Sequence, residues 1–151
     1  MNMRRLRKLV ATLLLSVMSF NIFADGTVVS PGQQATVTIA PNGVPIVNVN
    51  APNNQGISVT NFQEFNVGSN GEIINNADNT GRSYLGGLIP GNPNYAPNQA
   101  AQLIILQVNG SNRTTIEGYL EVLSRSKPNV ILSNENGITV NGGGTIGIAN
   151  F

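Results

Sequence analysis

Residues 127–146 read KPNVILSNENGITVNGGGTI, and no other segment constrains the fold as tightly. Three short runs of strand-forming residues begin at positions 129, 137 and 145, and the turns between them are only a few residues long, each with Asn or Gly. Because Asn and Gly tolerate the positive φ angles of tight corners, this spacing suits the successive rungs of a parallel β-helix. A β-sandwich predicts strands of similar length, so the periodicity alone leaves both folds open.

The rest of the chain shows the same all-β pattern, with almost nothing at helical spacing. In the clearest run, Ile116, Gly118, Leu120 and Val122 alternate with polar residues and would share the buried face of one strand. We expect strands at 34–40, 44–49, 57–59, 62–67, 72–74, 103–108, 115–122, 129–132, 137–140 and 145–148. Residues 75–102 carry many turn formers, which predicts a long surface excursion, and such excursions are often functional or disordered.

The composition excludes several classes of protein. The 151 residues include no Cys and no His, which excludes disulfides, zinc sites of the usual ligands and a His-based catalytic triad. Charged residues make up 10% and aromatic residues 5% of the chain, too few for a coiled coil or an aromatic nucleic-acid platform. Asn and Gly stand out instead, with 23 and 17 copies, and both are depleted in helices.

The first 24 residues have the pattern of a secretory signal peptide. Four basic residues within positions 4–8 precede an apolar run from 9 to 23 that closes on Ala24, where we expect cleavage. This run is shorter than the roughly 20 residues that cross a bilayer. The remaining residues, 25–151, hold four basic and seven acidic side chains, a net charge of −3, and no basic patch that would bind nucleic acid.

Candidate catalytic and cofactor sites are weak. Residues 142–147, GGGTIG, fit G-x-G-x-x-G, but no helix follows to receive a pyrophosphate, so we interpret them as a glycine-rich corner. Glu117 and Glu121 would lie roughly 13 Å apart on one strand, beyond the separation of about 5 to 9.5 Å in glycosidase pairs, and we interpret them as a solvated face. The other acidic residues fit no calcium-binding pattern. We therefore expect no catalytic residue, cofactor or metal.

Two Asn-rich turns are the most distinctive motifs. The first reads NPNY at 92–95, where the leading Asn can bond its own backbone and Pro presets φ at the second position. The second reads NENG at 134–137, where Asn-Gly is a strong turn dipeptide ahead of a strand-like run. Taken alone, each is simply a good turn. Their residues are Asn92, Pro93, Asn94, Tyr95, Asn134, Asn136 and Gly137.

Four ordered motifs resemble the amino-terminal two-partner-secretion domain: GGLIPGNPNYA from Gly86, AQLIILQVNGSN from Ala101, IEGYLEV from Ile116 and the quoted run from Lys127. That domain opens filamentous haemagglutinins, related adhesins and contact-dependent-inhibition toxins of Gram-negative bacteria. The resemblance is firmest from 62 to 146. It implies a right-handed parallel β-helix with a capping segment at its amino-terminal end and a non-enzymatic secretion and recognition role.

The resemblance also implies a route and partners. Family members cross the inner membrane by the Sec machinery, engage the periplasmic domains of a dedicated outer-membrane transporter, and pass through it unfolded to the cell surface or medium. The family signatures, of NPNL and NPNG type, fall on the two turns, with Tyr95 in place of Leu and Glu135 in place of Pro. Losing that Pro should loosen the second turn by roughly 0.4 to 1 kcal/mol.

Length is the main departure from the family pattern. The family's domain runs on past the NGGG-like motif, so we expect residues 25–151 to be a fragment, incomplete at the C-terminus, with contacts to host or neighbouring cells made by missing sequence. A coil that stops there exposes its last rung, which predicts a marginally stable or self-associating chain. The alternative is a secreted β-helix that binds or cleaves polysaccharide.

Overall fold

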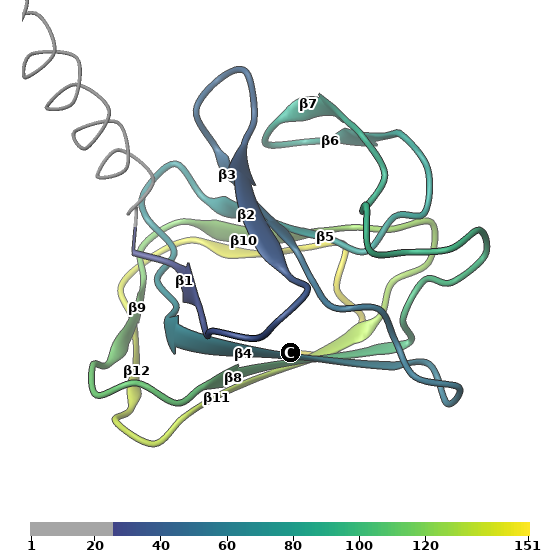
Figure 1. Ribbon diagram of the computed structural model, residues 1–151. Coiled ribbons are helices and arrows are strands. Elements are labelled where there is room, and N and C mark those ends of the chain that lie inside the picture. Colours follow the sequence, from purple (N-terminus) through teal and green to yellow (C-terminus); the bar gives the residue numbers. More distant parts are fainter. Residues whose placement is uncertain (1–25) are drawn as a thin grey trace, which may run out of the picture.

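The computed structural model describes residues 26–151, and the expected signal peptide lies outside the described residues. The chain winds into a coil with three sheets as its sides, and a separate two-stranded sheet lies outside the coil (Figure 1). Within 26–151 there is no helix, hence none that could span a membrane. The strands are β1 (Val28–Val29), β2 (Thr36–Ile39), β3 (Pro45–Asn48), β4 (Ile57–Glu64), β5 (Glu72–Asn75), β6 (Gly81–Ser83), β7 (Gly87–Ile89), β8 (Leu103–Val108), β9 (Thr114–Ile116), β10 (Tyr119–Leu123), β11 (Asn129–Asn134), β12 (Ile138–Val140) and β13 (Gly144–Ile146).

Each turn of the coil contributes one strand or bridge to each sheet. Sheet A has the order β1-β4-β8-β11, sheet B the order β13-β10-β5-β3-β2, and sheet C contains β12 and β9. The strands β4, β8 and β11 run parallel, as do β3, β5, β10 and β13. The expected parallel β-helix is therefore confirmed, and the face-to-face antiparallel sandwich is excluded.

Antiparallel strands close the amino-terminal end of the coil. The strand β1 pairs antiparallel with β4, and β2 pairs antiparallel with β3, so each of the two large sheets ends in a reversed strand (Figure 1). This is the expected capping segment. Its first strand, β1, carried no sequence signal because it is only two residues long.

The core fills the inside of the coil with aliphatic side chains. Its largest members, Phe62 and Phe65, pack edge to face with ring centroids 5.1 Å apart. A second, smaller apolar cluster lies on the outer side of sheet B, where Ile89 of β7 packs with Ile46 and Ile73. Sheet B is thus covered on both faces, which explains why every residue of β3 and β5 is buried.

The predicted strand at 115–122 is wrong, because the chain bends at Gly118 between β9 and β10. A Cβ on Gly118 would collide with the carbonyl oxygen of Gly68 in the preceding rung, and one on Gly143 would collide with the carbonyl oxygen of Gly118. Successive rungs therefore meet backbone to backbone at this corner, where only glycine fits. The predicted glycine-rich corner at 142–147 belongs to the same column, although its last residues form β13.

Two further predictions need correction. The expected strand at 57–59 and the start of the one at 62–67 form one continuous strand, β4, because Thr60 and Asn61 pair with β8. The strand ends at Glu64, and Val67 makes only an isolated bridge to Ile116. Residues 75–102 are not merely a surface excursion. They contain the hairpin β6–β7, which packs over the outer face of sheet B. Two of their asparagines, Asn76 and Asn92, are buried and bonded to neighbouring parts of the coil.

Candidate functional site

The NPNY motif forms a turn that is fastened to the coil by its first residue. Asn92 is 3% exposed, and its side-chain Nδ2 donates to the carbonyl oxygens of Val49 at 3.0 Å and Asn75 at 2.8 Å. Its backbone N–H donates to the carbonyl oxygen of Ala77 at 2.7 Å. One asparagine thus ties the excursion at 75–102 to two neighbouring rungs, where it satisfies backbone groups that would otherwise be buried without partners.

The turn itself is closed by two local hydrogen bonds. The N–H of Asn94 donates to the Asn92 side-chain oxygen at 2.9 Å, and the N–H of Tyr95 donates to the Asn92 carbonyl at 3.1 Å. Pro93 takes the second position, where its fixed φ suits the turn. The Tyr95 hydroxyl donates to Oδ1 of Asn76 at 2.7 Å. Burial raises the pKa of Tyr95, so this phenol stays protonated and keeps donating.

The NENG motif builds the same turn on the surface. The N–H of Asn136 donates to the Asn134 side-chain oxygen at 2.9 Å, and the N–H of Gly137 donates to the Asn134 carbonyl at 3.0 Å. Gly137 has a φ of 98°, which a side chain would strain. The Asn136 side chain donates to the carbonyl oxygen of Gly110 at 2.7 Å, in the corner of the previous rung.

The structure places the two motifs at different corners of the coil. Residues 92–95 lie on the connection from sheet B to sheet A, whereas 134–137 lie on the connection from sheet A to sheet C. The hydrogen bonds above share no residue between the two motifs. They are therefore two separate turns with the same pattern of local hydrogen bonds. The first turn is anchored by the buried Asn92, and the second lies on the surface.

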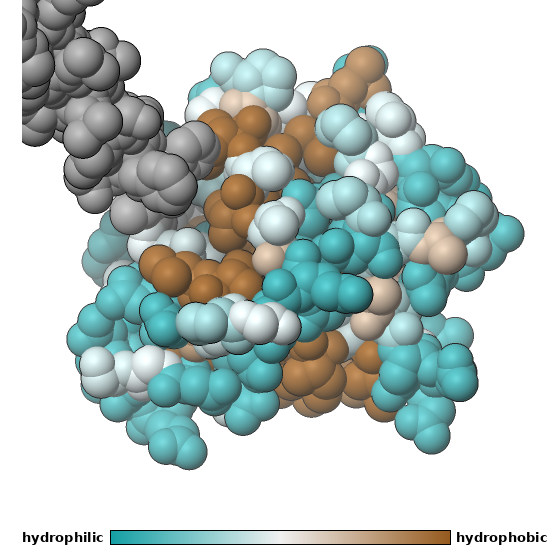
Figure 2. Space-filling view, in the orientation of Figure 1, coloured by the Kyte–Doolittle hydropathy of each residue, from teal (hydrophilic) through white to brown (hydrophobic). Residues whose placement is uncertain are grey.

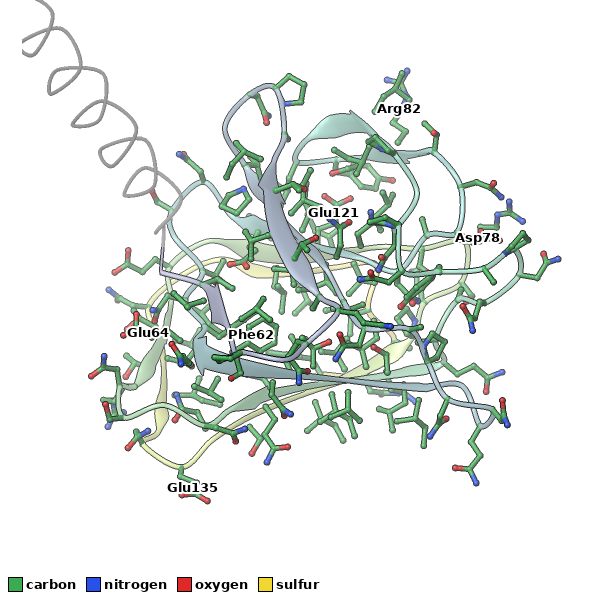
Figure 3. All side chains as sticks on the ribbon, in the orientation of Figure 1. Phe62, Glu64, Asp78, Arg82, Glu121 and Glu135 are labelled. Atoms are coloured by element: carbon green, nitrogen blue, oxygen red, sulfur yellow. The ribbon has the colours of Figure 1, made fainter. Side chains whose placement is uncertain are left out.

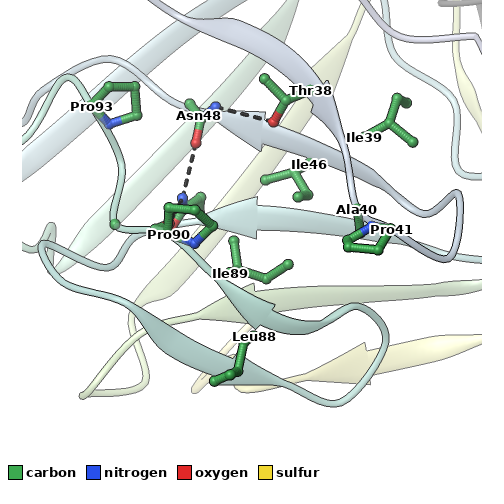
Figure 4. A pocket seen from close by; sticks show the side chains of 12 residues that line it. Thr38, Ile39, Ala40, Pro41, Ile46, Asn48, Leu88, Ile89, Pro90 and Pro93 are labelled. Carbon is green, nitrogen blue, oxygen red and sulfur yellow. Dashed lines mark hydrogen bonds between the residues drawn. The ribbon is translucent and has the colours of Figure 1, made fainter.

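A groove of about 560 Å³ lies beside the NPNY turn (Figure 4). It runs between the outer face of the β2–β3 hairpin and the strand β7. Its walls are mainly aliphatic and proline side chains, and its polar side chains are those of Thr38, Asn48 and Asn75. No charged side chain lines it. The groove suits an uncharged, apolar segment of a partner.

The prediction that Glu121 belongs to a solvated face is wrong. Glu121 is 2% exposed, and its carboxylate accepts from the hydroxyl of Ser83 at 2.7 Å and from the N–H groups of Tyr84 at 2.8 Å and Leu85 at 2.9 Å. Figure 3 shows it between sheet B and the β6–β7 hairpin. The strand alternation correctly directed it outward, but the hairpin covers it. Glu117, in contrast, is exposed.

The acidic side chains do not form a metal centre within residues 26–151: no group of three or more His, Cys, Asp or Glu could hold an ion there. Asp78 is instead tied into the excursion. Its carboxylate accepts from the N–H of Asn98 at 2.6 Å and lies 3.7 Å from the guanidinium of Arg125.

Comparison with known proteins identifies the family. The TPS secretion domain family matches residues 21–151. The chain belongs to this family. It is similar to the crystal structure of a filamentous hemagglutinin secretion domain, with a TM-score of 0.76 and 36% identity over 83% of this chain and 41% of that one. The shared β-helix and the recognised family agree with the resemblance of the four sequence motifs.

Full-length relatives have the same domain in much longer chains. The 16S rRNA endonuclease CdiA of Enterobacter cloacae is 43% identical over 81% of this chain, and the tRNA nuclease CdiA of Escherichia coli O6:K15:H31 is 44% identical over 82%. The hemolysin of Proteus mirabilis is 39% identical over 92%. This chain spans 4% of the length of each CdiA relative and 9% of the hemolysin.

These findings establish the general function of the chain. The chain is a secretion domain of the kind that CdiA-type, hemolysin-type and filamentous-hemagglutinin-type exoproteins possess, and such a domain is a transport and recognition module rather than a catalytic one. The comparisons favour this function over the polysaccharide-binding or polysaccharide-cleaving alternative.

Proposed function

We propose that residues 25–151 are the address that a dedicated outer-membrane transporter reads through its periplasmic domains, after residues 1–24 have directed the chain to the Sec machinery. The observation that carries this proposal is the TPS family match across 21–151, together with a coil whose amino-terminal end is capped. Release at the cell surface follows, and adhesion to a host cell or delivery of a toxin would then belong to sequence beyond this domain.

The edge of β2 is the part of the cap best suited to recognition. The Ala40 N–H donates to the Val44 carbonyl at 2.9 Å, so these two residues form a hydrogen-bonded pair of the β2–β3 hairpin. By the antiparallel alternation, Val37 and Ile39 then direct their backbone N–H and C=O groups away from β3. Within residues 26–151, β2 is the last strand of sheet B and nothing pairs with that side. It therefore presents unpaired backbone groups.

Strand addition at this edge gives a concrete mechanism for recognition. Exposed edges are usually protected by charges, proline or bulges, yet β2 reads TVTI, with no charge and no proline. An extended, weakly charged segment of the transporter can pair its backbone with β2, and its apolar side chains can enter the adjacent groove of about 560 Å³. Neither the backbone pairing nor the apolar contacts in the groove require a charge on this chain, in agreement with its small share of charged residues.

The test separates backbone pairing from side-chain contact. Val37→Pro removes the outward N–H without removing a hydrogen bond to β3, while the matched control Val37→Ala trims the side chain and keeps the N–H. We expect both variants to retain the β-sheet circular dichroism signal. Co-purification with the transporter's periplasmic domains should be lost in Val37→Pro and retained in Val37→Ala. Normal co-purification of a folded Val37→Pro variant would disprove strand addition at β2.

The two Asn turns are proposed to support export by keeping this address folded. In Asn92→Ala and Asn136→Ala, the amount of secreted chain should fall, and it should fall further for Asn92, because its buried bonds connect two rungs. Asn54→Ala, in an exposed turn, is the control. Secretion assayed beside the cognate transporter measures the effect. Unchanged export of both turn variants would refute their role.

A further inference from the structure

The outer face of sheet A carries a ladder of exposed and half-buried aliphatic side chains. Val59, Ile105 and Ile131 occupy the same register on β4, β8 and β11, so their side chains form one row across three strands. Val59 is 40% and Ile131 49% exposed. Ile57 and Leu103, two residues before on their strands, extend the row into a patch. We call these five residues the sheet A patch.

The sheet around this patch is uncharged. The other outward residues of β4, β8 and β11 are amides and one hydroxyl: Asn61, Gln63, Gln107, Asn129 and Ser133. Figure 2 shows hydrophobic surface along the lower side of the molecule, beneath β4. A neighbouring groove of about 390 Å³ reaches the patch through Ile57 and Val59. Typical monomers expose an apolar patch of about this size, and that patch is often a functional one.

We propose that the sheet A patch joins two copies of this chain face to face. The ladder is self-complementary under a two-fold axis that is parallel to β8 and midway between the two sheets, which lie about 10 Å apart. This axis sets Ile105 against Ile105 of the second copy and Val59 against Ile131 of the second copy. Because neither face carries a charge, two copies meet without repulsion, although the domain as a whole is acidic. The same acidity and the lack of basic residues on the patch disfavour an anionic membrane.

The size of the patch sets the strength of this association. Three strands about 4.8 Å apart and a rise of about 3.3 Å per residue give a patch on the order of 300 Å². A stable dimer needs about 800 Å² per partner. The association is therefore weak and reversible in dilute solution, and it strengthens where many copies are held close together, as on a crowded surface.

The experiment uses the full chain exported to the periplasm of a Gram-negative host without the transporter, and purified. Sedimentation velocity across a wide concentration range should show a monomer–dimer equilibrium for the natural chain. Ile131→Lys should raise the dissociation constant about tenfold or more, because it places a charge inside the apolar interface, opposite Val59 of the second copy. Leu88→Lys, at a side chain 64% exposed on the far side of sheet B, is the matched control and should leave the equilibrium unchanged.

A mixing experiment tests the geometry itself. Val59→Glu and Ile131→Lys variants should each be monomeric, yet an equimolar mixture should dimerise, because Val59 and Ile131 oppose each other across the proposed axis. Circular dichroism confirms that each variant is folded. A natural chain that stays monomeric at every concentration, a mixture that does not dimerise, or loss of dimer in Leu88→Lys would each overturn the proposal. So would an Ile131→Lys effect seen only as lost binding to phosphatidylcholine–phosphatidylglycerol vesicles.

Discussion

The side chain of Asn75 donates a 2.9 Å hydrogen bond to the side-chain oxygen of Asn48, a residue 27 positions earlier in the chain. The two asparagines end their strands, β3 and β5, in the same register, and both are buried. Asn75 also donates to the carbonyl oxygen of Pro90 at 3.0 Å, just before the NPNY turn. This pair therefore joins the cap, the next rung and the excursion in one polar network.

Asn75→Ala should lower the free energy of unfolding by about 1 to 3 kcal/mol, because the Asn48 oxygen and the Pro90 carbonyl would lose a buried donor. Urea denaturation measures the change. The control is Asn79→Ala, whose side chain is exposed and bonds only Asp78, at 3.4 Å; it should change stability by less than about 0.5 kcal/mol. Equal effects of the two substitutions would show that the network contributes nothing.

Stability should decline at alkaline pH through Tyr95. Burial raises its pKa in the folded chain above the value of about 10 in the unfolded chain, so the unfolded state loses its proton first. The contribution of Tyr95 is complete below pH about 10 and is lost as pH rises from there toward the folded-state pKa. Tyr95→Phe should flatten this decline, at a cost near neutral pH of about 1 kcal/mol for the lost bond to Asn76.

Urea titrations at pH 8 and pH 11 provide the measurement. Tyr84→Phe is the control, since that ring is 86% exposed, and it should keep the alkaline decline of the natural chain. An unchanged decline in Tyr95→Phe would assign the effect to other groups.

Gly118→Ala should destabilise the coil by about 1 to 3 kcal/mol, the usual cost of forcing an extra methyl group into a packed region. The new Cβ would meet the backbone of the preceding rung, which cannot move aside as a side chain can. Gly144→Ala is the matched control, because its Cβ would meet only the edge of the half-exposed Tyr119 ring at 3.1 Å. Thermal unfolding compares the two, and a larger loss for Gly144→Ala would argue against a backbone contact at the corner.

Glu135→Pro should stabilise the chain by about 0.4 to 1 kcal/mol. Glu135 holds the second position of the NENG turn, where Pro93 stands in the NPNY turn, and the preceding Asn134 ends a strand, as proline prefers. Asn136→Pro should do the opposite, since it removes the N–H that bonds the Asn134 side chain. Urea midpoints distinguish the two substitutions. A less stable Glu135→Pro variant would mean that the two turns differ in backbone conformation.

Much of the coil was predictable from local pattern. The runs at 103–108 and 129–132 are continuous and bounded by turn residues, so their existence did not depend on distant sequence. The break at Gly118 was not predictable in this way, since glycine fits the inward side of an alternating strand. Its cause is the carbonyl of Gly68, 50 positions away. The prediction for Glu121 was wrong for a similar reason. The hairpin that buries it is distant in sequence and comes from a segment without strand signals.

The candidate site was predictable as two turns but not as a network. Nothing local distinguishes the buried Asn92 from the exposed Asn136. A usable signal was present, however, in the repeated pattern of two aliphatic residues followed by Asn at 46–48 and 73–75, the positions that place Asn48 beside Asn75. Equivalent positions of successive rungs repeat residue types because they occupy the same environment.

The reversed cap strands give the molecule a direction of growth. At one end, the coil closes on the reversed strands β1 and β2. At the other end, within residues 26–151, β12 and β13 leave their outer ladders open, and β11 is paired only at its start, by residues 149–150. Each new coil needs only the rung before it, so the chain can be laid down progressively from a finished end. Each added turn of the coil would have to unfold before the chain could move back, so folding favours movement of the chain in one direction.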